Sequence, residues 1–126
     1  MAREPTAIDR LSVALISIEK AAADNVERSL EIQRRVRWLH EQIDRGQGVA
    51  ELVEAEQSPR VVELISANMV ALETVGSELR ASLALALRDE GLTIETIAGL
   101  FGVTRQRISA LLRQKAATEN PLAVRR

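Results

Sequence analysis

Apolar residues recur at intervals of three and four along most of the chain, which is the spacing of one face of an α-helix. The longest such series begins after Thr6 and reaches Ile43. Runs of alternating β-branched residues, which would indicate strands, are missing, and the chain has only 6 glycines and 3 prolines. The pattern therefore predicts an all-α protein.

The first predicted helix begins after Thr6, an N-cap residue, and Asp9 three positions later suits the positive end of the helix. Its apolar seam spans about five heptads, as in a coiled coil. We expect the seam to join two copies of the chain, as a parallel coiled coil or within a bundle of several helices. The alternative is that it packs against the third helix of its own chain. The seam consists of Ile8, Leu11, Leu15, Ile18, Ala22, Asn25, Ser29, Ile32, Val36, Leu39 and Ile43.

Two further helices are expected in the first two thirds of the chain. Glycines in the segment 46–48 end the first helix, and a short helix follows over 49–57. A third helix is expected to start with Ser58 as N-cap and Pro59 at the first helical position, and to end at Gly91. The pair Gly76–Ser77 could kink or divide it. The third helix is expected to bury Val62, Ile65, Met69, Leu72, Val75 or Gly76, Leu79, Leu83 and Leu87, whereas Glu51, Glu54 and Glu56 are expected to stay in solvent.

Residues 92–114 predict two helices joined by a sharp turn. Thr93 caps a helix over 94–101, Gly102 makes the turn, and Thr104 caps a second helix that runs from Arg105 to about Lys115. Ala98 lies four residues before Gly102, where two crossing helices approach most closely and a small residue is needed. The expected core positions are Ile94, Ile97, Phe101, Val103, Ile108, Leu111 and Leu112.

The outer face of the second of these helices is polar and basic. A helix with such a face can enter the major groove of DNA, where arginine binds guanine, glutamine binds adenine, and an alanine methyl contacts thymine. Arg105 and Gln106 stand at the end that first meets base edges, whereas Arg107 and Arg113 suit phosphates. The candidate DNA-contacting residues are Thr93, Thr104, Arg105, Gln106, Arg107, Ser109, Ala110 and Arg113.

This segment resembles the helix-turn-helix family of bacterial DNA-binding proteins. The residues that carry the resemblance are Ala98, Gly102, Val103, Ile108 and Leu111. It is more closely similar to the promoter-binding C-terminal region of sigma factors and to the C-terminal motif of invertases and resolvases. The resemblance implies binding of double-stranded DNA. Because little sequence follows Lys115, we expect the motif without a β-hairpin wing, and the chain has no promoter-melting region of a complete sigma factor.

The charge distribution favours a nucleic-acid contact at one end of the chain. The net charge is −1, but residues 1–77 hold 9 basic and 13 acidic side chains, whereas residues from Gly99 onward hold 6 basic and 1 acidic. A basic end on an acidic body suits DNA binding confined to one module. Arg34, Arg35 and Arg37 beside Trp38 and His40 form a second basic cluster that could contact DNA or a partner, although a solvated helix face explains it as well.

The chain lacks the residues that several other classes of function require. The chain has no cysteine and a single histidine, and it contains no nucleophile motif or phosphate-binding glycine loop, so we expect no catalytic, metal or cofactor site. Two aromatic residues are too few for stacking several unpaired bases. No apolar run is long enough for a membrane span, and the N-terminus has no apolar signal segment, so a cytoplasmic location at the nucleoid is expected.

The sequence thus predicts a helical dimerisation region over 1–77, a non-winged helix-turn-helix over 78–115 and a flexible tail over 116–126. The expected function is sequence-specific DNA binding by a homodimer, in transcription regulation or as a nucleoid-associated protein. An alternative is a helical adaptor that binds RNA polymerase or another regulator. A recombinase accessory fragment is a third possibility, but no catalytic serine or tyrosine context supports it.

Overall fold

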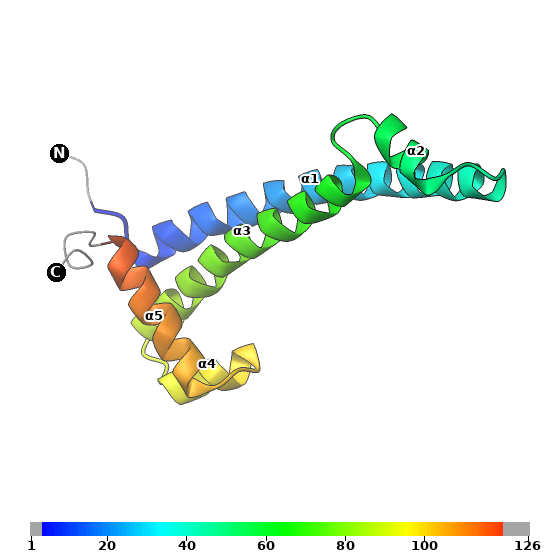
Figure 1. Ribbon diagram of the computed structural model, residues 1–126. Helices are drawn as coiled ribbons and strands as arrows, with labels where there is room; N and C mark the ends of the chain where they lie inside the picture. Colours follow the sequence, from blue (N-terminus) through cyan, green and yellow to red (C-terminus); the bar gives the residue numbers. More distant parts are fainter. Residues whose placement is uncertain (1–3, 120–126) are drawn as a thin grey trace. The chain divides into compact units, whose positions relative to one another are not determined.

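The computed structural model describes residues 4–119, with side chains as far as Ala116, and every regular element in this range is an α-helix (Figure 1). The prediction of an all-α protein is therefore confirmed. None of these helices is long and apolar enough to cross a membrane. The helices are α1 (Ala7–Asp44), α2 (Val49–Ala55), α3 (Val61–Asp89), α4 (Ile94–Phe101) and α5 (Arg105–Glu119).

The ends of the long helices follow the local signals in the sequence. At the start of α1, the Asp9 N–H donates to Thr6 Oγ1 (3.1 Å) while the Thr6 N–H donates to Asp9 Oδ2 (2.9 Å). This reciprocal pair satisfies two of the N–H groups that a helix start leaves without partners. Gly46 after α1 and Gly91 after α3 have φ values of +87° and +98°, a backbone conformation that glycine adopts most easily. Both helix ends were predicted correctly.

The start of α3 differs from the prediction, because the helix begins at Val61 rather than at Pro59. Glu56, which was expected in solvent, is 6% exposed, and its Oε1 accepts the N–H of Val61 at 2.6 Å. The same oxygen accepts Arg35 Nη1 at 3.0 Å, and Arg35 also donates to the carbonyl groups of Gln57 and Pro59. A buried carboxylate that is held by an arginine therefore caps α3, in place of the hydroxyl of Ser58.

Two further boundaries differ from those predicted. Helix α3 is continuous from Val61 to Asp89, so the pair Gly76–Ser77 does not divide it. Helix α5 extends to Glu119, so residues 116–119 of the predicted tail are helical. The rest of that tail, 120–126, lies outside the described residues.

The chain forms two compact units. The terminal unit combines residues up to 18 with those from 75 onward, and the hairpin unit is Glu19–Thr74. In the hairpin unit α1 and α3 lie side by side and antiparallel (Figure 1), and Arg28 Nη1 donates to Asn68 Oδ1 at 3.2 Å. Residues 7–18 of α1 thus group with α4 and α5, whereas the sequence pattern placed them in a separate region, 1–77.

The buried stripe of α1 is shifted by one position from the expected seam. Ala7, Ala14 and Ala21 are less than 10% exposed, and the heptad series continues with the half-buried Arg28 and Arg35. Four large residues of the expected seam are about half exposed: Ile8 56%, Leu15 50%, Val36 47% and Ile43 48%. The other four, Leu11, Ile18, Ile32 and Leu39, are partly buried. Small side chains on the buried stripe allow neighbouring helices to approach α1 closely, so one half of the expected seam lies beside this contact and the other half points outward.

Helix α3 shows the same shift in the hairpin unit. Val61 and Leu64 are buried there, whereas the expected core residues Val62 and Met69 are 64% and 69% exposed, and Ile65 and Leu72 are 43% and 38% exposed. The prediction that these four residues form the core is wrong within the described chain. Both long helices of this unit therefore carry a second apolar stripe that the hairpin itself leaves uncovered.

Candidate nucleic-acid interface

A three-residue turn connects α4 to α5 in the terminal unit. Gly102 ends α4 with φ +67° and ψ +34°, the left-handed helical conformation. The N–H of Val103 donates to the carbonyl of Ala98 at 3.1 Å, and the N–H of Gly102 donates to that of Gly99 at 3.3 Å. These bonds occupy carbonyl groups at the end of α4 and set the direction in which the chain enters α5.

Threonine side chains cap both helices, as predicted. Thr93 Oγ1 accepts the N–H of Thr96 at 3.1 Å at the start of α4. Thr104 Oγ1 accepts the N–H of Arg107 at 3.1 Å at the start of α5. Each cap begins its helix at a defined residue, so the side chains of the first turn of α5 have fixed positions along the helix.

Apolar contacts with α3 hold the two helices together. The fully buried residues Ile97, Ile108 and Leu111 pack with Ala98, which is 5% exposed, and with alanines of α3. Leu87, Leu92, Ile94, Phe101 and Leu112 pack against this cluster and are partly buried. The predicted core is confirmed with one exception, since Val103 is 40% exposed and does not fill the turn.

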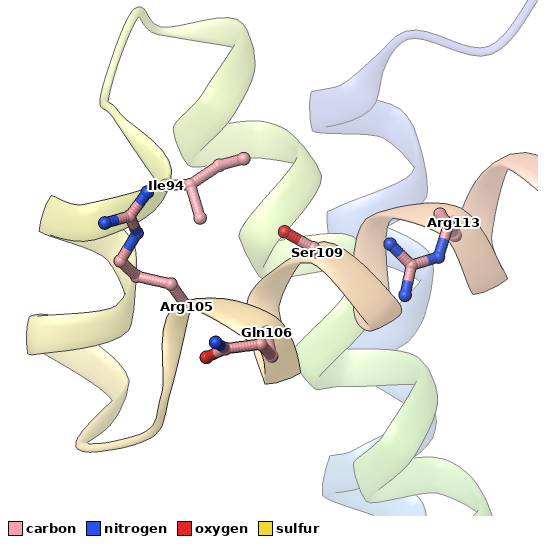
Figure 2. Close-up of a pocket in the computed structure, with 5 residues that line it drawn as sticks. All are labelled: Ile94, Arg105, Gln106, Ser109 and Arg113. Carbon is pink, nitrogen blue, oxygen red and sulfur yellow. The ribbon is translucent and has the colours of Figure 1, made fainter.

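The outward side of α5 forms an open groove together with the start of α4. The groove has a volume of about 460 Å³ and is lined by Ile94, Arg105, Gln106, Ser109 and Arg113. Figure 2 shows Arg105 extending from the start of α5 toward Ile94, while the other three polar side chains project from successive turns of α5. Four of the eight predicted DNA-contacting residues thus line one surface.

The other four predicted DNA-contacting residues do not line the groove. Thr93 and Thr104 are exposed at the helix starts, where their hydroxyl groups cap the backbone. Arg107 is exposed on α5, and Ala110 is half-buried. The polar side chains on this surface are therefore those of the groove and Arg107. The methyl group of Ala110 is only partly accessible.

One basic residue near the motif is withdrawn from the surface. Lys115 is 6% exposed, and its Nζ forms an ion pair with Glu78 of α3. The Glu78 carboxylate also accepts a hydrogen bond from the buried Ser82 at 3.3 Å. By sequence, Lys115 belongs to the basic end of the chain and Glu78 has no predicted role, because residues 37 positions apart give no local signal of pairing.

The second basic cluster is neutralised by nearby carboxylates in the hairpin unit. Arg34 Nη2 lies 2.7 Å from Glu31 Oε2, and Arg35 pairs with both Glu31 and Glu56. The hydrogen bond from Arg34 lowers the pKa of the Glu31 carboxyl below its usual value. With two of its three arginines in ion pairs, this cluster is a weaker DNA-binding candidate than the start of α5.

Among residues 4–119, no group of three or more carboxylate or imidazole side chains is placed to hold a metal ion. Comparison of this chain with protein-family models, curated proteins and solved structures gives no match.

Proposed function

We propose that this protein binds double-stranded DNA through α5, with α4, Gly102 and α5 acting as a helix-turn-helix. The observation that carries the proposal is the groove at the start of α5, where Arg105, Gln106 and Ser109 stand on a helix whose entry is set by a capped, left-handed turn. The same helix buries Ile108 and Leu111 on its inner side, so its two faces have separate roles.

The spacing of the groove residues suits the major groove. Arg105, Ser109 and Arg113 follow one another at intervals of four residues, so they lie on one side of α5. At 1.5 Å per residue the first and last are about 12 Å apart along the axis, which is comparable with the width of about 12 Å of the major groove. Arg105 can bind guanine and Gln106 adenine, while Arg107 and Arg113 can neutralise phosphates.

A single recognition helix has a small contact area, so we propose that two copies bind two half-sites. Linking the copies makes the second contact intramolecular and raises the overall affinity. The half-site centres are then expected about 34–36 Å apart, or at a multiple of that distance. The cellular role that fits this activity is regulation of transcription or a nucleoid-associated function in a bacterium.

Fluorescence anisotropy with DNA recovered by selection from random duplexes tests the proposal. Arg105→Ala and Gln106→Ala are each expected to weaken specific binding by about 1–3 kcal/mol and to relax the selected sequence. Arg37→Ala, which removes the same charge from α1 as Arg105→Ala removes from α5, is the matched control and is expected to leave affinity unchanged. Wild-type affinity should fall steeply between two salt concentrations.

A different result would refute DNA binding through α5. If Arg105→Ala and Gln106→Ala change neither affinity nor the selected sequence, α5 does not read bases. If no duplex is selected at low salt, the rival function gains support: a helical adaptor that binds RNA polymerase or another regulator. The exposed Val62 and Met69 favour that rival, because large apolar side chains in solvent often mark protein-binding surfaces.

A further inference from the structure

The hairpin unit has an uncovered apolar face formed by both of its long helices. On α1 it includes Val26 and Val36, and on α3 the residues Val62, Ile65, Met69 and Leu72; we call these six residues the hairpin face. Their side chains are 38–69% exposed. On α3 they follow one another at steps of three, four and three residues, the spacing of one side of a helix.

The two helices contribute to one continuous surface. A groove of about 290 Å³ is lined by Val26, Ser29 and Leu30 of α1 together with Leu72 of α3. Ser29 also accepts a hydrogen bond from Asn68 Nδ2 at 3.3 Å, which joins the helices beside this groove. The two stripes of the hairpin face therefore meet at Val26 and Leu72.

The six residues of the hairpin face are uncharged. The α1 positions between its members on the same side are Ser29 and Gln33, which are polar but uncharged. On α3 the exposed Glu73, one turn after Met69, borders the face. An uncharged centre can meet an identical copy of itself without repulsion between like charges, as a two-fold interface requires.

The width of the apolar stripes indicates how many helices pack together. A two-stranded coil needs only its two inner heptad positions to be apolar, whereas a helix in a bundle also has an apolar flanking position. In α3, Val61 and Leu64 occupy inner positions, and Ile65 and Leu72 occupy a flanking one. Helix α3 thus has apolar residues for two helical neighbours. Its long neighbour within the hairpin unit is α1, and a second hairpin can supply the other.

The hairpin face has the size of a small functional patch. From Val26 to Val36 and from Val62 to Leu72 it is about 15 Å long, and two helices 8–10 Å apart are about 20 Å wide. The flat outline of about 300 Å² is at the lower end of the largest apolar patches on soluble monomers, which are often functional.

We infer that the hairpin face binds the same face of a second copy, forming a four-helix bundle that is the dimer joint of the protein. This deepens the proposed function, since it rests on the homodimer stated there but not on DNA binding. It also replaces the parallel pairing of the seam from Ile8 to Ile43 with a specific alternative, because α1 already uses its inner positions against α3.

Sedimentation equilibrium of the full chain without DNA tests the inference. The wild type is expected to be a dimer at micromolar concentration. Met69→Glu places a carboxylate on the hairpin face and is expected to raise the dimer Kd at least about tenfold. Val70→Glu is the matched control, because Val70 is 64% exposed on the same helix but points about 100° away from Met69, outside the hairpin face, and the Kd of this variant should stay at the wild-type value.

A chemical footprint gives a second readout with variants that add no charge. The chain has no cysteine, so Met69→Cys and Val70→Cys each introduce a single thiol. Alkylation by iodoacetamide is expected to slow with rising protein concentration for Met69→Cys only. Far-UV circular dichroism checks that all variants remain helical.

Several results would overturn the inference. A wild-type monomer at high micromolar concentration excludes a second copy as the occupant, and slower alkylation of Met69→Cys on adding RNA polymerase would then assign the face to that enzyme. Equal loss of the dimer in Met69→Glu and Val70→Glu would place the joint elsewhere. Failure of DNA binding by a confirmed dimer would refute only the proposed DNA-binding function.

Discussion

Gly102→Ala tests the turn between α4 and α5 through the backbone alone. A Cβ added at Gly102 meets no atom within 4 Å, so the substitution introduces no clash. Its cost comes from holding a residue with a Cβ at φ +67°, about 1–2 kcal/mol. A smaller unfolded-state entropy, worth about 0.4–1 kcal/mol, offsets part of this. The expected net loss is therefore about 1 kcal/mol, and Gly102→Val should lose more because a β-branched residue resists positive φ.

Gly99→Ala is the matched control, three residues away in α4. It also meets no atom within 4 Å, but Gly99 has ordinary helical geometry, so alanine is expected to stabilise the helix by about 0.5–1 kcal/mol. The same chemical change should thus have opposite signs at the two positions. The two variants should differ by about 2 kcal/mol in the free energy of unfolding.

Urea denaturation followed by far-UV circular dichroism measures the difference. Thermal melting should agree, with Tm lowered by about 3–5 °C for Gly102→Ala in a chain of this length. Gly102→Val is also expected to lose DNA affinity, since α5 would no longer be held in its docking direction. If Gly102→Ala is as stable as the wild type, or if both alanine variants shift the same way, the left-handed turn is not the constraint that we infer.

Three further variants test the packing and electrostatics of the terminal unit. Ala98→Leu should overpack the contact between α4 and α5 and cost about 1–3 kcal/mol, checked by urea denaturation, and normal stability would mean that the helices do not approach closely at Ala98. Lys115→Gln should lower stability by about 1–3 kcal/mol, because the Glu78 carboxylate loses a charged donor, yet leave the salt dependence of DNA binding unchanged. Arg113→Gln, the same charge change in the groove, should reduce that salt slope by about 1. Equal slopes for the two variants would contradict the different placements of Lys115 and Arg113.

The elements that the sequence determined by itself are those governed by near neighbours in the chain. Thr6 with Asp9, Thr93 and Thr104 bond to backbone groups three residues away, so their capping roles are visible in the sequence. Gly102 and the core positions of α4 and α5 were also predicted correctly, since the turn is short and the motif contributes most of its own buried residues. The groove residues follow from the same helix periodicity.

Only the tertiary structure decided which stripe of α1 and α3 is buried. Periodicity favoured the bulkier stripe with Ile8 and Leu15, but helices pack closest over the small Ala14 and Ala21, whose burial depends on the neighbouring helix. Glu56 and Lys115 were misassigned for a related reason, because a charged side chain is buried only where a partner distant in sequence satisfies it. Hydrophobicity is a property of the single residue, whereas the face that a helix buries is set by what packs against it.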